Sequence, residues 1–339
     1  AAPGSVTVTL KGALRAVSGA GELAAIQQAR KAMLLSELDR FAPHALIVEL
    51  FPFGRKRFAF ELIPALEKVR SGPAPAKVIC SLRDILVTKR DQAAHEERVC
   101  GIVNRYFDHI LVHGDPRFQK LEASFSDVAG LRCPVEYTGY VVQRPSEHQE
   151  VEPDVPHDPF LIVTIGSGRY RNGHRLLQAV IRAAPLLRHR IVIFAGPFIP
   201  DEEFRRLREI AELQPNVQLE RYTPDLLPYM RRADLSISMG GYNTIMNILS
   251  TGTRAIVFPY TANDDQEQYI RAEKLHALGV VEMIHSDALE PARLAGIVRS
   301  VLRRNAAPPN WRMDGAAESA RAIGGLLHSQ TRAAEARRA

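Results

Sequence analysis

The alternation of short apolar runs with helix-like segments in the second half of the chain constrains the fold most. The runs are residues 160–165, 191–194, 217–219, 234–237 and 255–258, and most are apolar at consecutive positions. Strands buried on both faces have this character, and alternation with helices is typical of a parallel sheet. The clearest helix follows Pro200, with Asp201 as the expected N-cap and an apolar stripe at Phe204, Leu207 and Ala211.

The first half shows the same pattern less regularly. Its candidate strands are residues 6–10, 45–49, 78–81, 110–113 and 135–138, and a long helix is predicted over residues 22–40. Residues 6–10 are expected to form an edge strand of this sheet. The segment 143–159 is rich in proline and charge, as linkers are. The sequence thus predicts an N-terminal domain (1–145), a linker (146–159), a second domain (160–305), and a helix near 315–327 with a frayed tail (306–339).

Composition limits the classes of protein that fit. The 339 residues are enough for two domains, and no apolar run has the length that spans a bilayer. The three cysteines form no C-x-x-C pair, so neither a zinc site nor a disulfide framework is expected, and a cytoplasmic location fits best. The net charge of +6 suits an anionic substrate or a peripheral membrane contact, and no nucleic-acid module accompanies it.

Two glycine-bearing turns follow predicted strands and precede predicted helices. They are Gly166-Ser167-Gly168 and the segment that begins at Gly240-Gly241. Ligands of open parallel sheets bind beyond the carboxyl ends of the strands, where helix N-termini offer N–H donors to phosphate. Short glycine turns also join strands to helices where no ligand binds, and that alternative stays open for each turn.

A third polar segment, residues 259–269, follows the run 255–258. Glu267 and Gln268 place an acid beside an amide, a pair that suits sugar hydroxyls, which both donate and accept hydrogen bonds. The alternative is an ordinary helix N-terminus, where acidic residues such as Asp264 and Asp265 are favoured by the helix dipole.

Several motifs occur together in order: Gly-Gly-Tyr-Asn-Thr at 240–244, Leu-Ser-Thr-Gly at 249–252, Ala-Ile-Val-Phe-Pro at 255–259 and Asp-Gln-Glu-Gln-Tyr-Ile-Arg-Ala at 265–272. This combination resembles the donor-binding domain of GT-B glycosyltransferases, in the family of the N-acetylglucosaminyltransferase that completes lipid II, and especially a bacterial branch of predicted glycosyltransferases. Relatives usually carry Glu where this chain has Asn247, which removes a charge from the expected ribose contact. The donor-binding residues that the resemblance implies are Gly166, Ser167, Gly168, Gly240, Gly241, Tyr242, Asn243 and Thr244 near the diphosphate, Tyr222 and Thr223 beside the base, Asn247 at the ribose, and Asp265, Glu267 and Gln268 toward the sugar.

The first half resembles the same branch through residues 41–54, 81–85, 111–116 and 137–140. The acceptor-side residues that this implies are Phe53, Gly54, Arg83, Asp84, His113 and Gly139. Asp84 and Asp115 are equally suited to turn or cap roles. Residues 51–60 interleave four phenylalanines with three cations, which fits a membrane surface or an anionic acceptor, or else core aromatics beside a solvated turn.

The resemblance implies a GT-B fold of two Rossmann-like domains that face each other across a cleft. Relatives open with a strand, a Gly-rich loop and a helix that carries the histidine expected as general base, and nothing here corresponds. We expect an N-terminal domain without its first strand and helix, through truncation of the sequence or, as the alternative, degeneration of the protein. We also expect nucleotide binding with little turnover. The catalytic residue is unknown, and His113 is the candidate that remains.

The implied activity is transfer of a sugar from a nucleoside diphosphate sugar, a UDP-sugar, to a hydroxyl acceptor in bacterial polysaccharide or glycolipid synthesis. Neither a metal nor a cofactor beyond the nucleotide sugar is expected, because helix N-termini and side-chain donors stabilise the leaving diphosphate in such enzymes. A UDP-sugar 2-epimerase on the same fold and a non-catalytic subunit that binds donor or acceptor are the alternatives.

Overall fold

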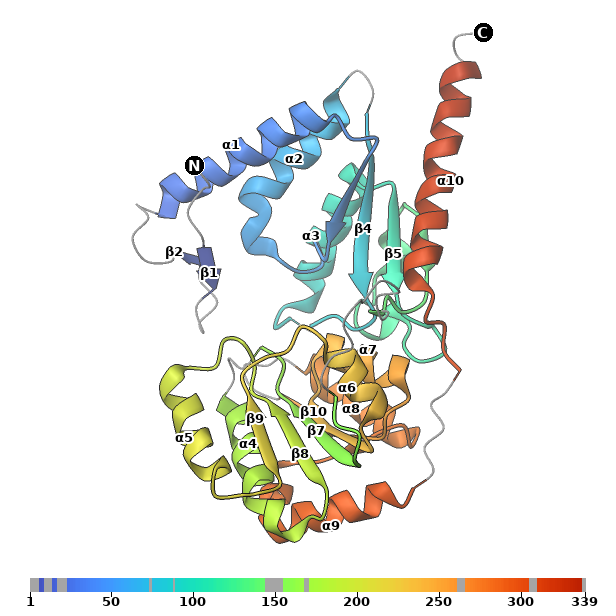
Figure 1. The fold of residues 1–339 in the computed structure, drawn as a ribbon. Coiled ribbons are helices and arrows are strands. Elements are labelled where there is room, and N and C mark those ends of the chain that lie inside the picture. The colour runs from blue at the N-terminus through green and yellow to red at the C-terminus, as the bar shows by residue number, and fades with distance from the viewer. Residues whose placement is uncertain are drawn as a thin grey trace. The chain divides into compact units, whose positions relative to one another are not determined.

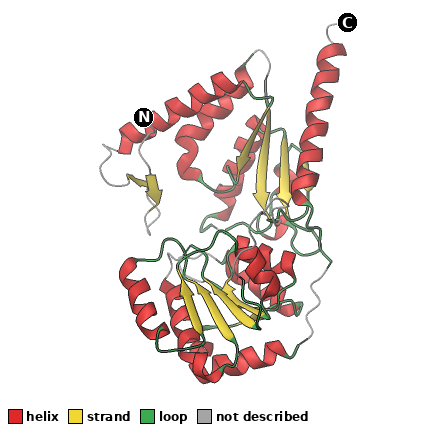
Figure 2. Ribbon diagram, in the orientation of Figure 1, coloured by secondary structure: helices red, strands yellow, loops and turns green. Residues whose placement is uncertain are grey.

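The structure, a computed structural model, describes residues 6–8, 14–16, 23–72, 75–87, 89–143, 155–167, 171–260, 266–304 and 310–336. It divides into two compact units, one formed by Ala1–Tyr140 with Asp314–Ala339 and the other by Val141–Met313 (Figure 1). Each unit contains a parallel sheet with helices packed on it, as the sequence predicts (Figure 2). The linker expected over 146–159 lies largely outside the described residues.

The second unit contains a six-stranded sheet in the order β12-β11-β10-β7-β8-β9, with every neighbouring pair parallel. The five strands predicted in this half are confirmed, and the short β12 is additional. The chain enters the sheet at β7, builds outward through β8 and β9, and then returns to place β10 on the other side of β7. The strands are β7 (Phe160–Thr164), β8 (Arg190–Phe194), β9 (Val217–Glu220), β10 (Leu235–Met239), β11 (Ala255–Phe258) and β12 (Glu282–Met283).

This reversal of direction distributes the helices over both faces of the sheet. Parallel strands are joined by right-handed crossovers, so connections that run in opposite directions place their helices on opposite faces. Figure 1 shows α4 (Arg171–Ala183), α5 (Asp201–Ala211) and α9 (Pro291–Leu302) on one face, and α6 (Leu226–Arg232), α7 (Tyr242–Thr251) and α8 (Glu267–Ala277) on the other.

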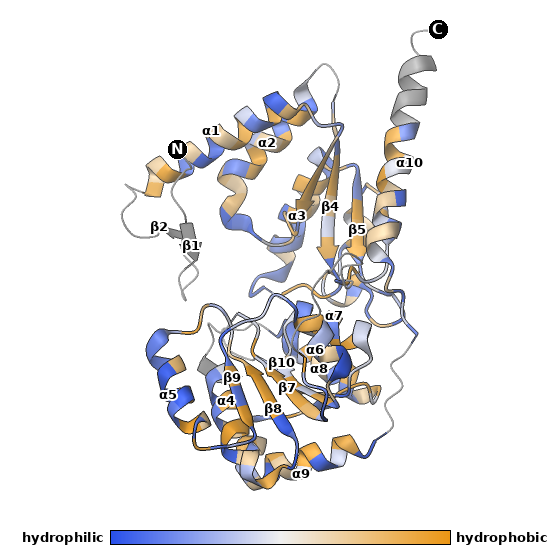
Figure 3. Cartoon of the chain, viewed as in Figure 1, coloured by the Kyte–Doolittle hydropathy of each residue, from blue (hydrophilic) through white to orange (hydrophobic). Residues whose placement is uncertain are grey.

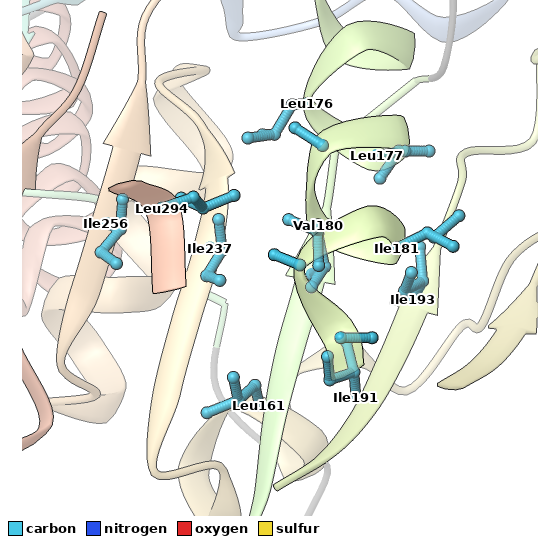
Figure 4. Close-up of a cluster of buried hydrophobic side chains, with 14 of the residues drawn as sticks. Leu161, Leu176, Leu177, Val180, Ile181, Ile191, Ile193, Ile237, Ile256 and Leu294 are labelled. Carbon is cyan, nitrogen blue, oxygen red and sulfur yellow. The ribbon is translucent and has the colours of Figure 1, made fainter. Parts of the chain in front are cut away.

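The core of this unit lies between the sheet and helices α4 and α9, which cover one of its faces (Figure 4). Leu161 and Ile193 of the sheet, Val180 of α4 and Leu294 of α9 are almost completely buried in it. Burying a side chain of this kind stabilises a fold by about 1.5–3 kcal/mol. The central strands β7, β8 and β10 are accordingly coloured mostly as hydrophobic in Figure 3.

Helix α5 confirms the predicted stripe, since Phe204, Leu207 and Ala211 are its buried residues. The predicted cap is wrong. Pro200 occupies the N-cap position, and Asp201 is the first residue of the helix. The Asp201 carboxylate accepts a hydrogen bond from Arg221 at 2.8 Å, and an acid in the first turn is stabilised by the helix dipole without acting as a cap.

The first unit holds a four-stranded parallel sheet in the order β3-β4-β5-β6. Its strands match four of the predicted ones, and α1 corresponds to the predicted long helix. Leu66 of α2 and Val99 of α3 pack with Cys80 and Ile110 in the core. The elements are α1 (Leu23–Phe41), β3 (Ala45–Glu49), α2 (Ala59–Ser71), β4 (Lys77–Arg83), α3 (Gln92–Tyr106), β5 (His109–His113) and β6 (Val135–Tyr137). The short 3-10 helices of this unit are η1 (Lys56–Phe58), η2 (Leu121–Ala123) and η3 (Val128–Gly130). Those of the second unit are η4 (Ala184–Leu186) and η5 (Ser286–Leu289).

The prediction that residues 6–10 form an edge strand of the parallel sheet is wrong. The strand there, β1 (Val6–Val8), pairs antiparallel with β2 (Leu14–Ala16) in a separate two-stranded sheet. Antiparallel neighbours need only a short connection, whereas a parallel neighbour requires a crossover of a dozen or more residues. Local pairing with the next apolar segment therefore replaces the pairing that the sequence pattern favoured.

The last helix, α10 (Gly315–Ala336), extends beyond the predicted 315–327 into the segment that was expected to fray. Its C-terminal part is rich in Ala, Arg, Glu and Gln, which favour helix. It begins where Gly315 donates its N–H to the Tyr140 carbonyl at 3.0 Å, which ties it to the first unit. A Cβ at Gly315 would lie only 2.7 Å from that Tyr140 carbonyl carbon, so the approach requires glycine. None of the helices in the described segments combines the length and apolar composition needed to cross a bilayer.

Candidate functional site

In the second unit, the two predicted glycine turns lie at the same edge of the sheet. They follow β7 and β10, which are parallel neighbours with Thr164 in register with Ser238. The carboxyl ends of these strands are therefore adjacent, at the point where the strand order reverses. Open parallel sheets bind their ligands at this position.

The turn after β7 depends on Gly166. Its φ is +66°, in the left-handed region that favours glycine, and its N–H donates to Thr164 Oγ1 at 3.3 Å. A Cβ built on Gly166 would meet nothing within 4 Å, so the space beside this turn is open. The next residue, Ser167, accepts a hydrogen bond at its carbonyl from Phe198 N–H, which fixes the turn against the loop after β8.

The two glycines after β10 have different surroundings. A Cβ on Gly240 would lie 3.2 Å from Val257 Cγ1 and 3.5 Å from Gln268 Cβ, so this residue lets α8 pack closely. Gly241 is the N-cap of α7, and a Cβ there would meet only Thr244 Oγ1, at 4.0 Å. No side chain caps α7, and the first-turn N–H groups of any helix lack intrahelical acceptors. Gly241 thus leaves the α7 N-terminus open to an anion.

Helix α8 brings the third predicted segment to the same place, and the prediction that it begins at Glu267 and Gln268 is confirmed. Gln268 Oε1 accepts a hydrogen bond from Tyr260 N–H at 3.1 Å, which links α8 to the loop after β11. Glu267 Oε1 accepts one from Arg271 Nη2 at 2.9 Å. The Arg271 guanidinium is fully buried and lies 5.1 Å from the ring centroid of Tyr242. The same guanidinium therefore contacts both Glu267 and the first residue of α7.

The remaining residues predicted to bind the donor differ in their exposure to solvent. Tyr222 is 60% exposed after β9, and Thr223 Oγ1 accepts a hydrogen bond from Asp225 N–H at the start of α6. On α7, Asn243 is exposed and Asn247 is buried one turn later. Thr244, between them, is also buried. Gly168 and Asp265 lie outside the described residues, so their positions stay predictions.

In the first unit, the predicted acceptor-side residues gather at the carboxyl edge of the other sheet. Register places Glu49 opposite Ser81 and Arg83 opposite His113. Because the strands are parallel, the segments after them lie at one edge. Those segments carry Phe53 and Gly54 after β3, Asp84 after β4 and Gly139 after β6.

Hydroxyl groups contact both ring nitrogens of His113. Nε2 lies 2.7 Å from Ser81 Oγ, and Nδ1 lies 3.0 Å from Thr138 Oγ1. Burial lowers the pKa of His113 below 6.5, and the carboxylate of Glu49 opposes that shift. The imidazole is therefore neutral at pH 7, the form that accepts a proton.

Three other predicted residues have structural partners. Asp84 is fully buried, and the Tyr140 hydroxyl donates to its Oδ2 at 3.3 Å. Asp115 accepts hydrogen bonds from both the backbone and the guanidinium of Arg117, which is the turn role named as its alternative. Gly139 has φ +84° and donates its N–H to the Gly114 carbonyl.

The sequence pattern missed Glu49 as a member of this edge. Its carboxylate accepts from Arg55 Nη2 at 2.8 Å and lies 3.4 Å from Arg83 Nη2, so it connects the loop after β3 to the end of β4. A charged residue that ends an otherwise apolar strand was the available signal. Phe51 and Phe53 are buried, which confirms the core interpretation for these two aromatics. Within the described parts of the chain, no three His, Cys, Asp or Glu side chains are grouped as metal ligands.

Comparison with known families agrees with this geometry. Residues 160–323 match the family described as glycosyltransferase family 28 C-terminal domain. The match contains both glycine turns, the N-terminus of α7 and the start of α8. The chain is thus similar to this family over a segment that includes most of the second unit.

Curated relatives match over parts of their length. An uncharacterized glycosyltransferase of Methanosarcina mazei is 30% identical over 139 residues, 41% of this chain and 34% of that protein. A UDP-N-acetylglucosamine–N-acetylmuramyl-(pentapeptide) pyrophosphoryl-undecaprenol N-acetylglucosamine transferase of Prochlorococcus marinus is 24% identical over 237 residues, 68% of this chain and 63% of that protein. The chain thus spans less than two thirds of the length of these relatives.

Solved structures confirm the predicted GT-B architecture. The calicheamicin glycosyltransferase CalG4 aligns with 94% of this chain and 81% of its own, at TM-score 0.54 and 15% identity. MurG of Acinetobacter baumannii aligns with 93% and 82%, at TM-score 0.51 and 14% identity. A putative UDP-N-acetylglucosamine 2-epimerase of Listeria monocytogenes aligns with 92% and 82%, at TM-score 0.59 and 14% identity. At these identities the likeness concerns the fold alone.

Proposed function

We propose that this chain transfers a sugar from a nucleoside diphosphate sugar, a UDP-sugar, to a hydroxyl acceptor in bacterial polysaccharide or glycolipid synthesis. One observation carries the proposal. The glycosyltransferase family 28 C-terminal domain at residues 160–323 brings a glycine turn, an uncapped helix N-terminus and an acid–amide pair to one edge of its sheet.

The diphosphate of the donor binds at the turn of Gly166 and at the N-terminus of α7. Both places offer backbone N–H groups beyond strand ends, and the helix dipole adds a favourable field for an anion. The open space beside Gly241 and Gly166 admits the phosphates without displacing a side chain. The charge that develops on the leaving diphosphate is stabilised there without a metal ion in this proposal.

The rest of the donor extends to both sides of that anion site. Glu267 and Gln268, held by Arg271 and by the Tyr260 backbone, contact the sugar hydroxyls. Tyr222 presents an exposed aromatic ring suited to the nucleobase. Asn247 replaces the charged ribose contact of relatives with a neutral amide.

The reaction breaks the bond between the anomeric carbon and the diphosphate oxygen and joins that carbon to the acceptor oxygen. The electron pair of the broken bond leaves with the nucleoside diphosphate, and the acceptor hydroxyl loses its proton to a base. We take His113 as the candidate base, because its imidazole is neutral at pH 7 and lies at the acceptor-side strand ends. A cytoplasmic location at the inner membrane face fits a lipid-linked acceptor and is part of the proposal.

The 2-epimerase is the second candidate, because a putative 2-epimerase shares this fold and the fold alone does not decide between the two activities. The two activities differ in the fate of the donor sugar. We would incubate the chain with UDP-N-acetylglucosamine, with and without a pool of saccharide and lipid-linked acceptors, and follow the sugar and phosphorus resonances by NMR. A transferase releases UDP in step with acceptor consumption. Release of UDP together with a 2-epimerised sugar, without any acceptor, would contradict the transferase.

A further inference from the structure

Two aromatic side chains are mostly exposed to solvent among the residues that the structure describes in the second unit. Phe198, in the loop after β8, is 58% exposed, and Tyr222, in the loop after β9, is 60% exposed. Strands β8 and β9 are parallel neighbours, and Phe194 at the end of β8 is in register with Glu220 at the end of β9. Both rings therefore lie at the edge of the sheet where the donor turns lie.

The loop that carries Phe198 is held from both sides, because β8 lies between β7 and β9. Toward β7, the N–H of Phe198 donates to the Ser167 carbonyl at 3.0 Å. Toward β9, the N–H of Gly196 donates to the Arg221 carbonyl at 2.8 Å. Gly196 has φ +93°, in the left-handed region that favours glycine. Phe198 is thus fixed between the first glycine turn and the start of the loop after β9.

The residue after Phe198 anchors the loop in the core. Ile199 is 3% exposed, and its carbonyl accepts a hydrogen bond from Arg221 Nη1 at 2.9 Å. Pro197 and Pro200 restrict the backbone on either side. The loop therefore buries Ile199 and leaves the ring of Phe198 at the surface. A side chain on a backbone restrained in this way costs less entropy to immobilise against a ligand.

The place of Phe198 lies on the path that the donor nucleotide has to take. Thr164, Phe194 and Glu220 are in register, so β7, β8 and β9 end at one level. Neighbouring strands lie about 4.7–4.9 Å apart, so the ends of β7 and β9 are about 10 Å apart. The diphosphate is assigned to the turn after β7, and the nucleobase to the loop after β9. The nucleoside therefore crosses the end of β8, where Phe198 lies.

The chemistry of the phenylalanine ring indicates which part of the nucleotide it contacts. The faces of nucleobases stack on aromatic side chains. A diphosphate binds N–H donors and cations, and ribose hydroxyls need hydrogen-bond partners, neither of which a phenyl ring offers. A single exposed aromatic residue is ordinary on a protein surface. Here two of them follow adjacent strands beside an anion site, and this combination favours a base.

We propose that Phe198 contacts the nucleobase of the donor and, together with Tyr222, supplies the aromatic surface on which the base is held. This inference rests on the proposed transferase function, because the nucleotide belongs to the donor of that reaction. Phe198 binds the nucleoside and leaves the diphosphate contacts unchanged. It therefore determines how strongly the protein prefers a nucleoside diphosphate to pyrophosphate.

Calorimetric titrations with UDP and with inorganic pyrophosphate test this role. Phe198→Ala removes the ring, and Phe198→Trp keeps an aromatic face. The control is Leu213→Ala, which removes an apolar side chain that is 76% exposed before β9, at the opposite edge of the sheet. We expect Phe198→Ala to bind UDP at least about fivefold more weakly than the parent, as for the loss of one contact between a base and an aromatic ring. Its affinity for pyrophosphate should be unchanged, and Phe198→Trp and Leu213→Ala should bind UDP as the parent does.

Three results would overturn the proposal. Equal UDP affinities in the parent and Phe198→Ala would show that the ring does not contact the nucleotide. An equal loss for UDP and pyrophosphate would show that the substitution acts through the turn of Ser167. A loss for UDP-N-acetylglucosamine without a loss for UDP would place the ring against the sugar.

NMR of the parent with bound UDP gives an independent measurement that needs no variant. We expect nuclear Overhauser effects between the uracil H5 and H6 protons and the ring protons of Phe198, and their absence would contradict the contact. The parent also separates this inference from the proposed function. If the parent binds UDP and Phe198→Ala binds it equally well, only the role of Phe198 is refuted. If the parent binds no UDP, the donor site and this inference are refuted together.

Discussion

Ser81 Oγ lies 2.7 Å from His113 Nε2, and this contact joins the neighbouring strands β4 and β5 near their carboxyl ends. The other ring nitrogen lies 3.0 Å from Thr138 Oγ1, directly after β6, so hydroxyls on both sides of β5 orient the imidazole. A neutral histidine held in one orientation at a strand end is suited to accept a proton from an acceptor hydroxyl.

The first expectation concerns the protonation of His113. Burial lowers its pKa, so the unfolded chain takes up the proton more readily than the folded chain. The contribution of His113 to stability is fully present above about pH 6.5 and decreases as the pH falls toward the folded pKa. NMR titration should give His113 a pKa below 6.5, and His113→Gln should reduce the loss of stability between pH 7 and 5. A pKa at or above 6.5 would contradict the burial argument.

A second expectation concerns Glu267. Glu267→Ala leaves the buried guanidinium of Arg271 without this carboxylate, so it should lower the free energy of unfolding by about 3 kcal/mol. Glu267→Gln keeps the size and an acceptor oxygen, and should be the milder change. If Glu267 reads the sugar, Glu267→Gln weakens UDP-sugar binding but keeps the dissociation constant of UDP within about twofold. Equal weakening of both ligands would show that the sugar contact is assigned wrongly.

A third expectation concerns acid stability. Burial opposes ionisation of Glu96, but hydrogen bonds from the Ser126 side chain, Gln92 and the backbone N–H groups of Ser126 and Asp127 outweigh it and lower the Glu96 pKa to about 2. This contribution to stability is fully present above about pH 4.5 and is lost as the pH falls toward 2. Urea unfolding at pH 5 and pH 3 should show a steeper loss of stability in the parent than in Glu96→Gln. Equal losses would indicate that this carboxylate is not stabilised in its ionised form.

The sequence predicted the two sheets well because their strands are short, apolar and separated by clear helices. Residues 45–49 and 255–258 coincide with β3 and β11. The failures occur where local pattern does not decide the outcome. The strand at Val6 pairs antiparallel with β2 rather than with the parallel sheet, and Asp201 forms an ion pair with Arg221 rather than capping α5.

The donor side was accessible to sequence analysis because each turn directly follows a strand. The hydrogen bond that holds Gln268 could not be predicted, since its contact with Tyr260 N–H depends on how α8 packs. The acceptor side was predicted less completely. Ser81 and His113 are 32 residues apart in sequence, and only the β4–β5 register brings them together. Residues 53–58 and residues 89–98 likewise line one pocket of the first unit, although no motif connects the two segments.

The central claim is that the N-terminus of α7 binds the donor diphosphate, and one pair of variants tests it. Gly241 has φ −61° and ψ 145°, which a side chain adopts without strain, and its Cβ would project into open space. Gly72, at the end of α2, has φ −70° and ψ 165° with nothing within 4 Å of a built Cβ, so Gly72→Val is the matched control. Loss of the glycine cap in Gly241→Val should cost no more than about 1 kcal/mol of stability.

Calorimetric titration of UDP into the parent, Gly241→Val and Gly72→Val is the most direct measurement. We expect Gly241→Val to weaken UDP binding by at least about a hundredfold, since the isopropyl group at the cap would exclude phosphate oxygens from the N–H groups of the first turn. Gly72→Val should bind UDP as tightly as the parent. If Gly241→Val binds UDP with the affinity of the parent while both variants stay folded, the diphosphate does not bind at α7, and the donor site lies elsewhere.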